Sequence, residues 1–197
     1  MAIHTLIRAT GPRWDEATRS PFLDALAAGT LPADALHRWL AQDYLFAKDL
    51  LAFQAILLAK APRNCHQPLI EGLAALNSEL GWFESQATRL RVDLDLPPHA
   101  TCRRYTDFLI RCAYTRPYAV LLAMLFGVEA SYLAAWSALA PAGPYVEFIE
   151  RWSSAEFGAY VAALGGLADQ HPHEEAQQYF NEVLVHERAF WRMSLEG

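Results

Sequence analysis

The sequence has few charged residues and no cluster of basic ones. Only 19% of its 197 residues are charged, the formal net charge is −6, and lysine and arginine are spread along the chain. Nucleic-acid-binding proteins usually carry a dense basic patch that neutralises phosphates. We therefore expect no nucleic-acid partner. The 53% hydrophobic content instead predicts a substantial core, and the length predicts a single domain over residues 1–197.

Cysteine is also scarce. Cys65, Cys102 and Cys112 are odd in number and lack a Cys-x-x-Cys spacing, so neither a disulfide framework nor a zinc site is predicted. The N-terminal segment has no basic start followed by a continuous apolar stretch, so we expect no secretory signal and a reducing, cytoplasmic location. The sequence also contains no glycine-rich phosphate loop and no serine nucleophile elbow.

Strand-forming patterns are nearly absent, because β-branched residues are few and apolar residues recur every three to four positions. This spacing predicts an all-α fold, a compact bundle of about seven helices. Proline, glycine and serine mark the expected helix ends, as at Ser20-Pro21 and at Gly165-Gly166. The predicted helices cover residues 21–28, 33–60, 67–91, 101–114, 117–140, 145–164 and 173 to the C-terminus.

The most apolar stretch, VLLAMLFGVEASYLAAWSALA at residues 120–140, carries Glu129 as its single charge. A helix that is apolar on all sides lies in a protein core or in a membrane. A charge near its middle, with no basic cluster before Arg151, argues against a membrane span. Glu129 is then either a structural carboxylate satisfied by a tyrosine or arginine, or a pocket residue on the same face as Tyr132 and Trp136.

A second carboxylate, Asp43, shares a predicted helix face with Trp39 at i−4 and Phe46 at i+3. One interpretation is that Asp43 faces water or pairs with Lys48 or Arg38. The other is that it accepts hydrogen bonds from the amino group or ring N–H of a ligand.

A third carboxylate, Glu187, precedes Phe190 and Trp191 on the apolar face of the last helix. Apolar surroundings raise the pKa of a carboxyl group, and this would suit a general acid near neutral pH. The alternative is a surface pair with Arg188 or Arg192.

Metal ligands are not well represented. Glu182 and His186 have the Glu-x-x-x-His spacing found in di-iron bundles, but no second such motif occurs, so we expect no metal. His171-Pro172-His173 is interpreted as a loop before a helix. Tyr105 and Trp152 are aromatic residues among polar ones. The residues together favour an acidic, aromatic pocket for a small, flat, nitrogen-containing ligand.

The segment PFLDALAAGTLPADALHRWLAQDYLF resembles the start of the TenA (thiaminase II-like) family, with its Pro-Phe, Gly-Thr-Leu-Pro turn and Gln-Asp-Tyr. The resemblance covers nearly the whole chain, through LNSELG, the Tyr105 helix, the Glu129 helix, Trp152 with SSAEF, and the final HERAFW. It implies a haem-oxygenase-like all-α fold, a homotetramer, and hydrolysis of aminopyrimidines without metal or cofactor. We expect a homo-oligomer, a tetramer or a dimer, and no membrane partner.

Carried over by position, the resemblance implies that Asp43 holds the aminopyrimidine ring and that Glu187 protonates the leaving nitrogen. Tyr105 and Tyr132 would line the pocket, with Phe46 and Trp152 where tyrosines are common in the family. The predicted substrate-binding residues are Trp39, Asp43, Phe46, Tyr105, Tyr132 and Trp152, and the predicted catalytic residues are Glu129 and Glu187.

One position departs from the better-studied members. Val128 stands where they have a nucleophilic cysteine, and Glu129-Ala130-Ser131-Tyr132 looks like the subgroup that lacks it. The implied reaction is hydrolysis of a formylaminopyrimidine or aminomethylpyrimidine in pyrimidine salvage, rather than of thiamin. Glu129 would either activate water or hold the ring's amino group. Two alternatives stay open: a non-catalytic binding or regulatory protein, and an oxidase of the haem-oxygenase-like superfamily.

Overall fold

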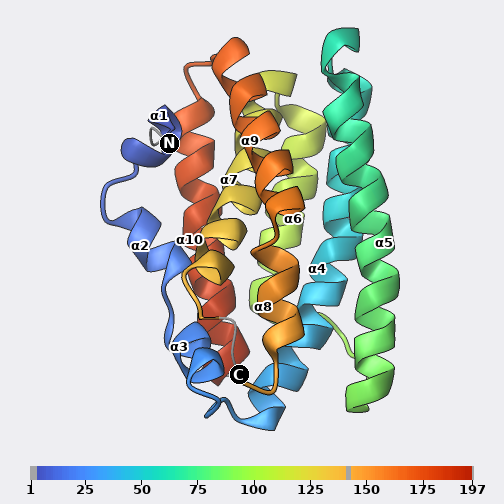
Figure 1. Cartoon of the computed structure of the whole chain (residues 1–197). Coiled ribbons are helices and arrows are strands. Elements are labelled where there is room, and N and C mark those ends of the chain that lie inside the picture. The colour runs from blue at the N-terminus through green and yellow to red at the C-terminus, as the bar shows by residue number, and fades with distance from the viewer. Residues whose placement is uncertain (1–3, 141–142, 197) are drawn as a thin grey trace. The chain divides into compact units, whose positions relative to one another are not determined.

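The computed structural model describes residues 4–140 and 143–196. Over these ranges the regular secondary structure is helical and contains no strand, so the all-α prediction is confirmed. Figure 1 labels the α-helices in chain order. They are α1 (Thr5–Arg8), α2 (Arg13–Thr18), α3 (Pro21–Ala27), α4 (Ala33–Lys60), α5 (His66–Leu90), α6 (Ala100–Thr115), α7 (Tyr118–Ser137), α8 (Val146–Trp152), α9 (Ala155–Gln170) and α10 (Ala176–Glu196), with a 3₁₀ turn, η1 (Arg63–Cys65), before α5.

The chain divides into two compact units. Unit 1 comprises Met1–Leu31 and Ala119–Arg192, and unit 2 comprises Pro32–Tyr118 and Met193–Gly197. Unit 1 therefore contains the whole of α1, α2, α3, α8 and α9, together with nearly all of α7 and most of α10. Unit 2 contains α4, η1, α5 and α6. The single-domain organisation stays a prediction.

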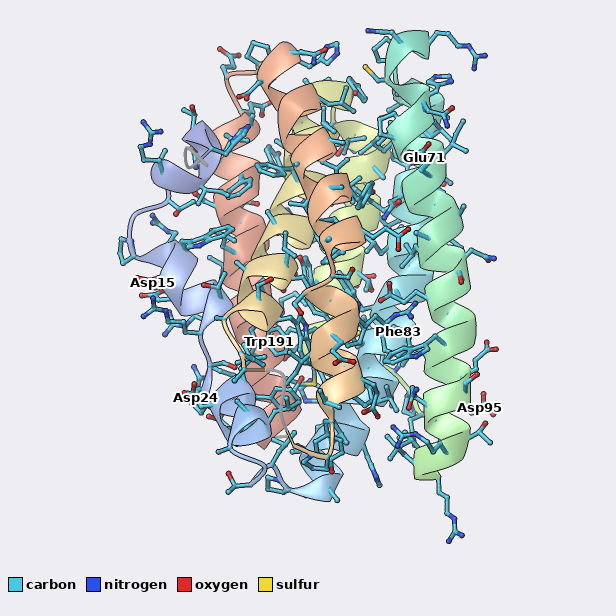
Figure 2. All side chains as sticks on the ribbon, viewed as in Figure 1. Asp15, Asp24, Glu71, Phe83, Asp95 and Trp191 are labelled. Carbon is cyan, nitrogen blue, oxygen red and sulfur yellow. The ribbon has the colours of Figure 1, made fainter. Side chains whose placement is uncertain are left out.

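Unit 2 is built on α4, against which both α5 and α6 pack. Trp39 and Phe53 of α4 are fully buried. Phe83, labelled on α5 in Figure 2, lies with its ring centroid 6.5 Å from that of Trp39. The helix α5 ends at Leu90, and the next residue, Arg91, adopts a left-handed conformation with φ of 58° that terminates the helix.

Unit 1 is centred on α7, which is buried over almost its whole length from Val120 to Val128. This helix is long and apolar enough to cross a membrane by composition, but 78% of its apolar window is buried inside the protein. It packs closely on α10, because a Cβ at Gly127 would lie 3.2 Å from Val183. Phe126 and Phe180 extend the contact, with ring centroids 5.8 Å apart.

The short helices α1 and α2 were not predicted from the sequence. Side chains of α10 bind this N-terminal segment, which runs alongside α10 in Figure 1. Trp191 donates its indole N–H to the carbonyl of Ala17 at 3.0 Å, and Arg188 pairs with Glu16 at 2.8 Å. A helix of six residues such as α2 is too short to be stable alone, so these tertiary contacts hold it.

The predicted helix over residues 145–164 is wrong in two respects. It is broken between Trp152 and Ala155, where the Ser154 hydroxyl accepts a hydrogen bond from the backbone N–H of Phe157 at 3.2 Å and begins α9. It also continues past Gly165 to Gln170, because Gly165 serves packing rather than termination: a Cβ there would meet the Phe126 ring at 3.2 Å. The predicted helix end at Pro141-Ala142 lies outside the described residues, and α7 ends at Ser137.

Candidate functional site

The Gln-Asp-Tyr motif of α4 places three consecutive side chains on three sides of one helix. Gln42 accepts a hydrogen bond from the backbone N–H of His99 at 2.7 Å, so it fixes the loop before α6. Tyr44 points the other way and donates its hydroxyl to Glu84 of α5 at 2.9 Å. Asp43 lies between them in sequence and is only 7% exposed. The flanking residues thus lock the rotation of α4 that buries the Asp43 carboxylate.

The aromatic pair Phe46 and Tyr105 lies on the facing sides of α4 and α6. Their ring centroids are 4.7 Å apart with planes inclined by 35°. On α4, Phe46 follows Asp43 by three residues, so the two side chains share one face. On α6, Cys102 and Tyr105 share one face for the same reason. The predicted ligand residues Asp43, Phe46 and Tyr105 are therefore brought together within unit 2.

The sequence left open whether Asp43 faces water or a ligand, and in the structure its carboxylate does not face water. Arg38 instead donates to the carbonyl of Ser194 at 3.0 Å and pairs with Asp34. The Lys48 ammonium lies over the Tyr44 ring at 5.5 Å. Arg38 and Lys48, the two surface partners considered for Asp43, therefore make their contacts elsewhere, and the Asp43 carboxylate is buried.

Trp39 was predicted to contact a ligand, and the structure places it in the packing of α4 on α5. It is completely buried and its ring lies against Phe83. Its contact with a ligand stays a prediction.

Cys102 lies beside Asp43, but its thiol is poorly suited to nucleophilic attack. Burial, followed by the charges of Asp43 and Asp49, raises its pKa to about 12. With this pKa the thiol stays protonated near neutral pH. Because only the thiolate is a strong nucleophile, Cys102 is unreactive there. Cys65 and Cys112 are buried as well, and all three cysteines belong to unit 2.

In unit 1 an aromatic cluster forms from Tyr132 and Trp136 of α7, Trp152 of α8 and Trp191 of α10. Tyr132 contacts all three indoles: it stacks on Trp191 at 5.8 Å and meets Trp152 edge-on at 5.3 Å and Trp136 at 5.8 Å. The three tryptophans are at most 2% exposed, whereas Tyr132 is half-buried. Trp191, labelled in Figure 2, was noted in the sequence only as a neighbour of Glu187.

The two predicted catalytic carboxylates stand on the helices that carry this cluster. Glu129 precedes Tyr132 by three residues, and Glu187 precedes Trp191 by four, so each carboxylate projects from the face that bears an aromatic ring. Glu187 is 5% exposed. A surface pair with Arg188 is excluded, since Arg188 binds Glu16. Glu129 is half-buried rather than fully enclosed.

Tyr160 of α9 is a residue that the sequence reasoning missed. Its hydroxyl oxygen is buried and has no hydrogen-bond partner among the described residues. Burial raises the pKa of the phenol far above its usual range, and the nearby Glu129 carboxylate raises it further. The sequence holds one hint, because Tyr160 is the only tyrosine on a helix otherwise rich in alanine and glycine.

Metal ligands do not gather at these positions. Within residues 4–140 and 143–196, no group of three or more His, Cys, Asp or Glu side chains is arranged to hold a metal ion. Glu182 accepts a hydrogen bond from Gln178 at 3.0 Å. His173 accepts one from the backbone N–H of Glu175 at 3.1 Å, which confirms that it belongs to a loop leading into α10.

A sequence profile of the TENA/THI-4/PQQC family matches residues 8–197. The chain belongs to this family. A soybean (Glycine max) relative called a probable bifunctional TENA-E protein is 27% identical over 200 residues, covering 92% of this chain and 87% of its own length. The TenA homologue from Pyrococcus furiosus superposes with a TM-score of 0.89 at 32% identity, covering 96% of this chain and 97% of the other. A putative TenA-like thiaminase from Sulfolobus solfataricus shares the fold, with a TM-score of 0.85 at 20% identity and coverage of 96% and 93%.

The TenA match includes both sets of candidate residues. The profile begins at residue 8 and therefore contains Asp43, Phe46 and Tyr105 of unit 2 as well as the aromatic cluster and glutamates of unit 1. The TenA fold confirms the all-α class and the family expected from the Gln-Asp-Tyr segment.

Proposed function

We propose that this TenA-family protein hydrolyses a C–N bond of a formylaminopyrimidine or aminomethylpyrimidine, in salvage of the thiamin pyrimidine. Family membership supports this proposal, as do a relative named TENA-E and a structural neighbour named as a thiaminase. The observation that carries it is the pair of glutamates, Glu129 and Glu187, on two helices joined by one aromatic cluster.

Glu187 is the proposed proton donor. Its carboxyl group is buried on the helix face that carries Trp191, so it is shielded from bulk water. An amine or amide nitrogen leaves poorly as an anion, and a proton delivered to it as the C–N bond breaks lowers the barrier. We assign this transfer to Glu187.

Glu129 is the proposed second carboxylate, with two roles to separate. As a general base it would take a proton from the attacking water. As a binding group it would accept a hydrogen bond from the amino group of the ring. Its half-buried position on α7 is compatible with either role.

The aromatic residues and Asp43 are the proposed ligand-binding groups. In unit 2, the Asp43 carboxylate would accept hydrogen bonds from the aminopyrimidine, with Phe46, Tyr105 and Trp39 as aromatic neighbours. In unit 1, the half-buried Tyr132 is the proposed residue on which the flat ring stacks, and the buried Trp152 supports it edge-on at 5.3 Å.

We further propose that the chain belongs to the subgroup without a catalytic cysteine. Val128, the residue at the cysteine's place, is 3% exposed on α7. No cysteine occurs in unit 1, and the Cys102 thiol of unit 2 stays protonated because its pKa is raised to about 12. Direct attack by water, independent of metal, follows as the proposed chemistry, and thiamin is then a poor substrate.

The test is to incubate the purified protein separately with thiamin, aminomethylpyrimidine and formylaminopyrimidine, with and without a chelator, and to follow pyrimidine products by chromatography. The proposal expects turnover of one or both aminopyrimidines, undiminished by the chelator. Turnover of none would contradict it. Activity lost to the chelator would contradict the metal-independent mechanism and favour the oxidase alternative.

A second candidate function is a non-catalytic binding or regulatory protein, which the missing cysteine favours. The same incubation separates the two: saturable binding of a pyrimidine, measured by calorimetry, without product would support the binding protein.

We also propose a cytoplasmic homo-oligomer, a tetramer or a dimer. Large apolar side chains lie exposed on the described surface, Tyr114 at 72% and Val185 at 58%. Light scattering that gives the mass of one 22.1 kDa chain would contradict it.

A further inference from the structure

The hydroxyl group of Tyr160 is a feature of unit 1 that the proposed mechanism leaves unused. Its oxygen is buried, and no described side chain or backbone group of the protein forms a hydrogen bond with it. Buried hydroxyls nearly always have a partner, because burial without one forfeits the hydrogen bonds made in water. A water molecule bound at this hydroxyl would supply the partner that the protein does not.

The helix register places this hydroxyl beside Glu129. Near the middle of α7, Phe126 lies against Gly165 of α9, where a Cβ would approach its ring to 3.2 Å. Farther along α7, Tyr132 lies against Trp152 at 5.3 Å, just before α9 begins. The two chain segments therefore run in opposite directions.

Between these two contacts stand Glu129 on α7 and Tyr160 on α9. The influence of the Glu129 carboxylate on the pKa of the Tyr160 phenol agrees with this register, since charges act strongly only at short range. Both residues belong to unit 1.

The two groups have complementary requirements. The phenol, which keeps its proton because its pKa is raised, has an O–H to donate. An ionised carboxylate only accepts. The two do not bond directly, because the Tyr160 oxygen has no partner in the protein. A water molecule accepts one hydrogen bond and donates two, so it can join them.

We propose that Tyr160 and Glu129 together hold the water molecule that attacks the substrate. This inference rests on the proposed function and assigns Glu129 the water-activating role. Tyr160 donates to the water oxygen and Glu129 accepts from one water proton, which fixes the molecule at two points.

The step balances with these groups and Glu187 alone. On a formylaminopyrimidine, the water oxygen forms a bond to the formyl carbon, the carbonyl π electron pair moves onto its oxygen, and one water proton passes to Glu129. The C=O bond then re-forms as the C–N bond breaks, the C–N electron pair stays on nitrogen, and nitrogen takes the proton of Glu187. Formic acid and the aminopyrimidine are released, and the formic acid, which carries the second water proton, ionises in solvent to formate. The proton on Glu129 returns to Glu187 through solvent, so no oxidant or reductant is required.

The role of Tyr160 is tested by comparing Tyr160→Phe with Tyr145→Phe on formylaminopyrimidine. Tyr145 is another half-buried tyrosine of unit 1, with its ring against Phe148 at 6.3 Å, and serves as the control. We expect Tyr160→Phe to lower kcat by roughly 10-fold to 100-fold with KM changed by less than about threefold. Its Tm should stay unchanged or rise, because no hydrogen bond within the protein is lost.

A competing nucleophile separates a water-holding role of Tyr160 from a structural one. If Tyr160 only supports the fold, its substitution should not change how the formyl group is divided between water and the added nucleophile. With added hydroxylamine, Tyr160→Phe should release a larger share of the formyl group as formohydroxamate than the wild type or Tyr145→Phe, because water is no longer held. An unchanged kcat and unchanged partition in Tyr160→Phe, with the wild type active, would overturn the role of Tyr160 alone. A lower Tm with unchanged partition would also overturn it, in favour of packing. An inactive wild type on every pyrimidine would overturn the proposed function and this inference together.

Discussion

The ring of Trp191 stacks on the ring of Tyr132, with centroids 5.8 Å apart and planes within 11° of parallel. This contact joins α10 to α7 one helical turn from each glutamate, because Glu187 precedes Trp191 by four residues and Glu129 precedes Tyr132 by three. The stacked pair therefore sets how the two carboxylates are placed relative to each other. The indole N–H of Trp191 is itself fixed by the Ala17 carbonyl, so the N-terminal segment supports the same geometry.

The two adjacent glycines of α9 should respond to alanine with opposite sign. At Gly165, a new Cβ lies 3.2 Å from the Phe126 ring, which is held between His4 and Phe180, so we expect Gly165→Ala to destabilise the protein by about 1–2 kcal/mol. At Gly166 a Cβ meets nothing within 4 Å, so Gly166→Ala should stabilise by about 0.5–1 kcal/mol through helix propensity. Urea unfolding of both variants measures the difference. Equal shifts of the same sign would contradict the packing of α9 on α7.

The cysteines should be inert in the folded protein. The pKa of Cys102 is raised from 9.0 to about 12, so its thiol is protonated at pH 8 and should not react with iodoacetamide until the protein unfolds. Because the unfolded chain loses this proton at lower pH than the folded one, the group's stabilising contribution is complete below pH 9 and is lost as the pH rises toward 12. Cys102→Ala should weaken that alkaline loss. Rapid labelling of Cys102 in folded protein at neutral pH would contradict its burial.

Local rules predicted the helices that carry their own start and end residues. Ser20 caps α3 by accepting a hydrogen bond from the N–H of Leu23 at 3.2 Å, and Gly29 takes the positive φ of 69° that its turn needs. The break at Ser154 follows the same capping rule but has no proline or glycine to mark it. Gly165 was misread because its reason is the Phe126 ring of another helix, which the local sequence does not show.

The candidate site was predictable to the extent that it depends on one helix at a time. The i, i+3 spacing correctly placed Asp43 with Phe46 on one face. The contact of Phe46 with Tyr105 and the stacking of Tyr132 on Trp191 needed the tertiary structure. The position of Tyr160 beside Glu129 depends on the register of α9 against α7, and this register cannot be predicted from the sequence of either helix alone.

Asp43→Asn should weaken ligand binding without disturbing the fold. The amide keeps the size of the carboxylate but replaces a charged acceptor, and a charge-assisted hydrogen bond is commonly worth about 1.5–3 kcal/mol. We expect about a 10-fold to 100-fold higher Kd for the aminopyrimidine by calorimetry. The control is Asp34→Asn on the same helix, whose side chain is 80% exposed and should have no effect. An unchanged affinity in Asp43→Asn would assign this aspartate a structural role.

Glu129→Gln should separate the two roles of that residue. If Glu129 activates water, the amide cannot take the proton, so turnover falls while pyrimidine binding is kept. If Glu129 holds the ring, both fall together. The water-holding role of Tyr160 requires the first result. Glu156→Gln, at an exposed position in the first turn of α9, is the control, and both variants are measured by steady-state kinetics and calorimetry.

The turnover of Glu187→Gln tests whether Glu187 donates the proton to the leaving nitrogen. The amide preserves the shape and hydrogen bonding of the buried side chain but has no proton to transfer to the leaving nitrogen. Glu182→Gln is the matched control on the same helix, since its carboxylate binds Gln178 at an exposed position. We expect Glu187→Gln to lower kcat on the active pyrimidine by roughly 10²-fold to 10⁴-fold with little change in Kd, and Glu182→Gln to equal the wild type. Equal turnover by Glu187→Gln and the wild type would contradict it.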